Sequence, residues 1–286
     1  MALETGGRSM SRTRGLLALL FLLIGLIYGP FINGQTSSGT SPFEVPSDLD
    51  LTGVWAMVQI TSEIVKIPIV GNRTRTNTTH LRLIIEQSDD ALSVLETNCG
   101  TDIDDGTMMV NTTIPDAFLL SLGVTERTAR LELVSETDPS TGNTAPECRI
   151  VFPWNAQVLG ARLEDPENEA LPMDATDPRV FDQDNDGYPG MTVRVGIMGL
   201  INGEVYVVQR NRNRLIGAVV SLGFIRGTIE WETEQVILGA SSPFLASGGQ
   251  GSPDPDPERN FFLARRIDPL LDCADIQQMD LLLLGD

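Results

Sequence analysis

The chain has 286 residues, with 39 acidic against 20 basic side chains and a formal charge of −19. This length allows a sizeable core, and an all-β chain of this size can still be a single domain. An acidic surface of this kind repels phosphate backbones and anionic headgroups. We therefore expect neither nucleic acid nor an anionic membrane surface as a partner.

The N-terminus has the layout of a secretory signal. A group of arginines precedes the apolar run 15–28, which is shorter than the roughly 20 residues that a spanning helix needs. We expect residues 1–34 to be a signal peptide, cut before Gln35, and the protein to be periplasmic or extracellular. The alternative is an uncleaved N-terminal membrane anchor.

Export makes the cysteines informative. The chain has 3 of them, Cys99, Cys148 and Cys273. An oxidising compartment favours one disulfide and leaves one thiol free. The residues by themselves leave the pairing open.

The rest of the chain is organised as short β-patterned runs. Residues 35–50 are rich in Ser, Thr, Gly and Pro, which is typical of a flexible leader. After them, apolar and polar side chains alternate, as in Leu81–Ile85 and Arg130–Val134, and this pattern is typical of strands with one solvated face. We expect residues 51–286 to form a single all-β domain, an antiparallel barrel or a sandwich of about ten strands with few short helices.

Two local signals stand out within this domain. Asn202 and Gly203 lie between two β-patterned runs and predict a hairpin turn. Pro115–Leu122 is one of few helical candidates, because Pro at a first helical position and Asp next to it fit a helix N-terminus.

Residues 158–190 interrupt the strand rhythm with a long acidic insertion. It contains prolines and also the apolar side chains of Leu163, Leu171 and Met173. We expect it to pack on the domain through these side chains rather than to be a disordered linker. Loops of this length in a compact domain are often functional.

The end of this insertion, residues 182–187, predicts a metal site. Three carboxylates on alternate residues, followed at once by a glycine, can converge on one hard cation, as in the first half of a calcium loop. Val193 stands where an EF-hand has its bidentate Glu, so a further ligand must come from elsewhere, with Asp177 or Asp174 nearest in sequence. The alternative is a turn without an ion, because Asp and Asn favour turns anyway. We predict a structural Ca²⁺ bound by Asp182, Asp184, Asp186, the carbonyl of Tyr188 and Asp177.

Signatures of catalysis are missing. His80 is the only histidine, and no Gly-x-Ser-x-Gly elbow, cysteine nucleophile motif or glycine-rich phosphate loop occurs. Zinc sites need several His or Cys ligands. Carboxylate pairs of the glycosidase type arise by chance among so many acids. We therefore expect no enzymatic activity.

Gly53-Val-Trp55, at the start of the first β-patterned run, resembles the Gly-x-Trp that opens lipocalins. The resemblance implies a barrel in which Trp55 closes the floor and stacks on an arginine of the last strand. Arg265 or Arg266 would take that part.

The same resemblance implies a disulfide between Cys99 and Cys273, which would tie the C-terminal segment to a barrel strand. The stretch 159–193, with its Asp-x-Asp-x-Asp-Gly loop, also resembles uncharacterised exported proteobacterial proteins. That second resemblance implies no particular activity.

These observations predict an exported, calcium-stabilised, non-catalytic β-barrel-like protein. If it is lipocalin-like, it binds a small apolar ligand in a cavity lined by inward apolar residues; otherwise these residues fill the core. The alternative is a structural or adhesive protein that uses calcium to contact a cell-envelope component. The sequence indicates no oligomeric state. The inward residues expected on this interpretation are Trp55, Leu83, Ile85, Val195 and Val207.

Overall fold

The computed structural model describes residues 49–67, 71–137, 144–246 and 251–280. The predicted signal peptide and most of the predicted leader lie outside these residues. Within them, no helix is both long and apolar enough to cross a membrane.

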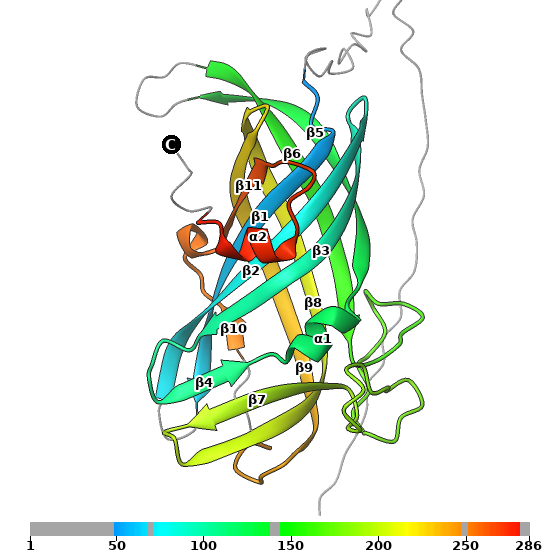
Figure 1. The fold of residues 1–286 in the computed structure, drawn as a ribbon, viewed down its shortest axis with the longest axis vertical. Coiled ribbons are helices and arrows are strands. Elements are labelled where there is room, and N and C mark those ends of the chain that lie inside the picture. Colours follow the sequence, from blue (N-terminus) through cyan, green and yellow to red (C-terminus); the bar gives the residue numbers. More distant parts are fainter. Residues whose placement is uncertain (1–48, 68–70, 138–143, 247–250, 281–286) are drawn as a thin grey trace, which may run out of the picture. The chain divides into compact units, whose positions relative to one another are not determined.

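The described residues form one antiparallel sheet with few helices (Figure 1). The helices are α1 (Asp116–Ser121), α2 (Cys273–Gln278) and the single 3-10 turn η1 (Pro257–Arg259). The prediction of an all-β fold with few short helices is confirmed. The strands are β1 (Gly53–Ile67), β2 (Gly71–Ser88), β3 (Ala91–Asp104), β4 (Val110–Thr113), β5 (Val124–Thr137), β6 (Thr144–Leu159), β7 (Met191–Ile197), β8 (Ile201–Ser221), β9 (Phe224–Ala240), β10 (Gly251–Pro253) and β11 (Phe261–Arg266).

The sheet closes on itself. β1 pairs with β2 on one side and with β11 on the other, and β9 pairs with both β11 and β8. The remaining neighbours are β2–β3, β3–β5, β5–β6 and β6–β8, which completes a ring of eight strands. β7 and β4 continue from the first half of β8, outside the ring path.

The prediction of a hairpin turn at Asn202 and Gly203 is wrong, because both residues lie inside β8. β7 and β8 are joined instead through Met198 and Gly199, which have φ values of 55° and 67°. Gly203 lies inside β8, where a Cβ would come within 2.4 Å of the Ser241 hydroxyl. Close packing, and not a turn, therefore accounts for this glycine. The helix predicted at residues 115–122 is confirmed as α1.

One half of the ring interior is a packed apolar core. Its side chains alternate along the strands, because successive residues of a strand point to opposite faces. Trp55, Leu83 and Ile85 belong to this core and fill it. Val207 packs instead in a second cluster around α1 and β7, with Val195 at its margin.

Contacts at the C-terminal end match what the lipocalin resemblance implies. The Arg266 guanidinium lies 5.1 Å from the centroid of the Trp55 ring and donates hydrogen bonds to the carbonyls of Asp50, Thr52 and Leu222. Cys99 and Cys273 form a disulfide. The bond holds α2 against the outer face of the ring, where Ile276 is fully buried.

Candidate functional site

The insertion between β6 and β7 covers residues 160–190 and is held on the outer face of β8. Leu171 packs with Ala161 and Val208, whereas Met173, also expected to be buried, is 78 % exposed. Arg210 on β8 donates hydrogen bonds to the carbonyls of Pro166 and Glu169. The insertion therefore has its own apolar and polar contacts with the sheet.

The two ends of the insertion meet through glycines. Gly160 and Gly190 have φ values of 75° and 86°, and a Cβ on Gly160 would lie 2.7 Å from the Cα of Gly190. Only glycine accommodates both the positive φ and this close approach. The Gln183 side chain accepts a hydrogen bond from the Gly160 amide at 2.6 Å. This contact ties Gln183 to the end of β6, and the bridge between Asp182 and Gly190 places residues 182–187 beside the start of β7.

The three carboxylates of this segment converge. One oxygen from each of Asp182, Asp184 and Asp186 lies within 4.8 Å of the other two. Backbone amides orient the outer two: Asp182 accepts from the amides of Asp186 and Gly187, and Asp186 accepts from that of Tyr188. Asn185 takes the positive φ of 57° that the turn between them requires. The group can hold a metal ion.

Asp184 carries the strongest indication of a cation. The residue is only 7 % exposed, its Oδ2 accepts from the Thr192 amide, and its Oδ1 has no hydrogen-bond partner among the described residues. Burial, together with the charges of Asp186 and Asp182, raises the pKa of Asp184. An unpaired buried carboxylate beside two others is unfavourable without a compensating charge, and oxygen-only ligands suit hard cations such as Ca²⁺ or Mg²⁺.

The other two predicted ligands behave differently. Asp177 engages the Arg179 side chain, with contacts of 2.7 and 3.0 Å, and lies outside the group of three. This ion pair and its hydrogen bonds lower the pKa of Asp177 to about 2. The Tyr188 ring stacks on Tyr206 at 4.2 Å between centroids. A metal contact by the Tyr188 carbonyl stays a prediction.

A second candidate site is a cavity of about 450 Å³ inside the ring, beyond the packed core. Along each strand the inward positions change from apolar to polar. On β1, Trp55 and Met57 are followed by Gln59 and Thr61. The same change occurs on other strands of the ring. The polar lining residues are Asn77 and Thr79 (β2), Asn98 and Thr101 (β3), Thr125 (β5), Gln157 (β6), Gln209, Asn211 and Asn213 (β8), and Thr233 and Gln235 (β9).

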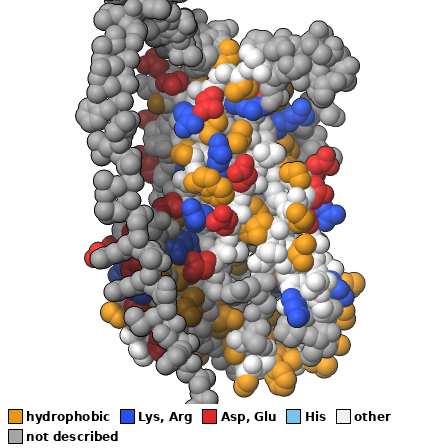
Figure 2. Space-filling model, turned by 180° about the vertical axis from the view of Figure 1, so that it is seen from behind, with side chains coloured by type: hydrophobic (Ala, Val, Ile, Leu, Met, Phe, Trp, Pro, Cys, Tyr) orange, Lys and Arg blue, Asp and Glu red, His pale blue; other side chains and the backbone are white. Residues whose placement is uncertain are grey.

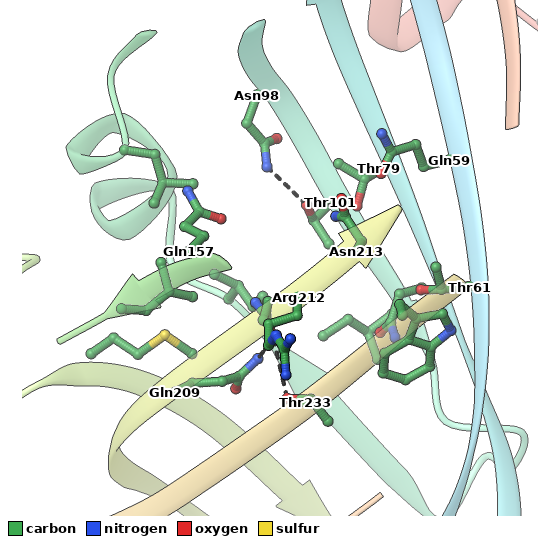
Figure 3. Close-up of a pocket in the computed structure, with 18 of the residues that line it drawn as sticks. Gln59, Thr61, Thr79, Asn98, Thr101, Gln157, Gln209, Arg212, Asn213 and Thr233 are labelled. Atoms are coloured by element: carbon green, nitrogen blue, oxygen red, sulfur yellow. Dashed lines mark hydrogen bonds between the residues drawn. The ribbon is translucent and has the colours of Figure 1, made fainter. Parts of the chain in front are cut away.

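These side chains face a common space and partly bond to one another (Figure 3). Asn211 Oδ1 accepts from Gln209 at 2.6 Å and from Thr233 at 3.1 Å. Asn213, the next inward residue along β8, has an Oδ1 without a hydrogen-bond partner among the described residues. The wall therefore offers amide and hydroxyl groups with hydrogen-bonding capacity left over.

The charged side chains of the lining are paired. Deep in the ring, Glu96 lies 3.7 Å from Arg127. Burial raises the pKa of Glu96 although Arg127 opposes this. At the other side, Arg75 bridges Glu63 at 3.3 Å and Asp105 at 2.8 Å, and it also contacts Thr112 on β4.

This polar cavity was not among the expectations from the sequence, although the sequence contains a pattern that indicates it. In the stretch 209–215 the inward residues are Gln209, Asn211, Asn213 and Leu215, and arginines occupy the outward positions between them. A period-two row of amides in line with an apolar residue indicates a polar inner wall rather than a solvated face. His80 and Cys148 do not line the cavity.

The comparisons with known proteins add no assignment. Neither the protein-family models, nor the curated proteins, nor the solved structures show a match to this chain.

Proposed function

We propose that the protein is an exported, non-catalytic binding protein that holds a small molecule inside a ring of strands stabilised by Ca²⁺. The observation that carries the proposal is the cavity of about 450 Å³, within the roughly 300–1,000 Å³ of ligand sites. The apolar core bounds it on one side, and the Arg75 contacts lie at the other. In this proposal the ring is lipocalin-like, with Trp55 and Arg266 at its closed end.

The calcium ion would act as a structural element. Its proposed ligands Asp182, Asp184 and Asp186 lie at the end of the insertion, next to β7, where Asp184 and Thr192 are buried. Binding would relieve the repulsion among the carboxylates and connect the insertion to the sheet. Residues 49–280 contain a disulfide, and disulfides persist in oxidising compartments, which supports export.

The test is native mass spectrometry of the protein exported by its own signal, with and without a chelator. We expect the mass of a chain cut before Gln35 plus one calcium, which is lost on chelation and in Asp184→Asn. Calcium at a concentration 100 times its Kd would stabilise the wild type by about 2.7 kcal/mol. Asp174→Asn is the matched control, because Asp174 lies in the same insertion but outside the group of three, and its carboxylate accepts hydrogen bonds from Thr176.

Each result of this measurement has a consequence. A calcium-free mass in calcium buffer would remove the ion from the proposal. Extra mass of a small molecule, lost when Thr233→Trp fills the cavity, would support binding inside the ring. Absence of such a mass in protein exported by its natural host would count against it.

A structural or adhesive role is the second candidate. Large apolar side chains are exposed just before β4, just after β7 and after β9, and the Met198 amide donates to the Met109 carbonyl between the first two of these segments. Figure 2 shows apolar side chains gathered at the lower end of one face. Such patches mark contact surfaces. Calcium-dependent dimers in the same spectra would favour this role. The exposed residues are Met108, Met109, Met198, Leu200 and Phe244.

A further inference from the structure

We infer that the ligand of the cavity is a neutral, hydroxyl-rich small molecule, a sugar or a related polyol. This inference rests on the proposed binding function and specifies the chemistry of its ligand. It departs from the apolar ligand that the lipocalin resemblance implies.

The hydrogen-bonding groups of the wall match those of a polyol. Asn and Gln each present an acceptor oxygen and a donor NH₂ group, and Thr presents a hydroxyl that can donate and accept. Neighbouring hydroxyl groups of a polyol have the same dual character, so one amide can serve two of them at once. The unpaired Oδ1 of Asn213 points to a donor that the described residues do not supply.

The amides of the wall disfavour an apolar ligand. Displacing water from these amides without replacing its hydrogen bonds would leave buried donors and acceptors unsatisfied. Each such group costs about 1–3 kcal/mol. A wholly apolar molecule would meet this cost at Asn211, Asn213 and Gln157 together, since all three line the cavity.

A charged ligand lacks a partner in the wall. Every charged side chain in the described lining belongs to an ion pair, including Glu96 with Arg127 and Glu63 with Arg75. A charged ligand would find no free partner of opposite sign there. A neutral ligand requires none.

The apolar part of the wall can contact the C–H faces of a sugar. Leu81, Ile229 and Trp231 line the cavity between the polar side chains and the core. The Trp231 indole is oriented by a hydrogen bond from its Nε1 to Asn260 Oδ1 at 2.7 Å. Sugars combine C–H faces with hydroxyl edges, so a mixed wall of this kind suits them better than it suits a fully polar solute.

The experiment is isothermal titration calorimetry of the exported, calcium-loaded protein with a panel of probes. Glucose, maltose and inositol represent the neutral polyols, glucuronate and glucosamine the charged analogues, and palmitate the apolar class. We expect saturable heat from at least one neutral polyol and from neither other class.

The variants place the binding in the cavity. Asn213→Leu keeps the side-chain shape and removes its hydrogen bonds, so affinity for the neutral probe should fall about tenfold. Gln157→Leu on the neighbouring strand β6 should act likewise. Asn111→Leu is the matched control, because Asn111 is exposed on β4 and does not line this cavity. Equal affinities in all these variants would overturn the inference, provided that their thermal unfolding shows them folded.

Failure of the inference and failure of the proposed function give different results. Binding of palmitate or of a charged probe, with no neutral polyol bound, would overturn the ligand class and leave the binding function intact. No binding by any probe, together with no co-purified mass that Thr233→Trp removes, would overturn both.

Discussion

At the residue scale, the buried pair Glu96 and Arg127 links stability to pH. Glu96 lies on β3 with its side chain inside the ring, and Arg127 on β5 is its partner at 3.7 Å. Burial of the carboxylate raises the pKa of Glu96 above its ordinary value of 4.5. The folded chain therefore holds this proton more tightly than the unfolded chain does.

The sign of the resulting pH dependence follows from linkage. The contribution of Glu96 to the free energy of unfolding is largest below pH 4.5 and decreases as pH rises through the raised pKa. In Glu96→Gln we expect the free energy of unfolding no longer to decrease over this pH range. Urea unfolding between pH 4 and 8 measures it, with Glu132→Gln, a half-buried carboxylate on β5, as the control. Parallel pH profiles for the wild type and Glu96→Gln would contradict the prediction.

At the scale of elements, the disulfide joins α2 to β3 across 174 residues of sequence. The capping box of Asp272 and Asp275 begins the helix, and Ile276 packs on Ala56 and Val58 of β1. A helix of this length is marginal alone, so its position depends on these contacts. The bond also restricts the unfolded chain, and the restriction grows with the length of the closed loop.

Removal of the bond should therefore be costly. The double substitution of Cys99 and Cys273 by Ala should lower the free energy of unfolding by about 2–5 kcal/mol. Cys148→Ala, at the free and half-buried thiol, should cost about 1 kcal/mol or less. Urea unfolding in non-reducing buffer separates the two. In reducing buffer the wild type should fall to the level of the double variant, and a wild type unaffected by reduction would contradict the prediction.

At the scale of the whole molecule, the closed ring requires close approach of neighbouring strands. Gly217 on β8 pairs with Gly227 on β9, and the Phe262 ring of β11 packs against them from inside. A Cβ on Gly227 would lie 2.1 Å from the Ile216 carbonyl oxygen. Both glycines therefore leave room for the core where β8, β9 and β11 meet.

Gly227→Ala tests this requirement. The added methyl group must push β8 away, which should lower the free energy of unfolding by about 1–3 kcal/mol. Gly223→Ala, in the turn between the same strands, meets nothing within 4 Å and should change stability by about 0.5 kcal/mol or less. Urea unfolding of both variants measures the difference. Equal effects would show that β8 and β9 do not approach as closely as described.

Much of the fold could be predicted from local pattern. Apolar alternation identified the β segments, and β8 and β9 also run through stretches of polar residues. The convergence of Asp182, Asp184 and Asp186 was predictable because alternate residues before a glycine turn inward together. The role of Asp177 as a further ligand stays a prediction; in the structure its carboxylate accepts hydrogen bonds from Arg179.

The sequence by itself determined the all-β class, the acidic loop and the cysteines available for a disulfide, because these depend on neighbours along the chain. The tertiary structure alone decided which strands pair, how the ring closes and where the polar rows of Gln209, Asn211 and Thr233 meet. A period of two shows that a strand has two faces, but it does not show which face turns inward or which distant strand lies opposite. The cavity exists only once those non-local pairings bring the rows together.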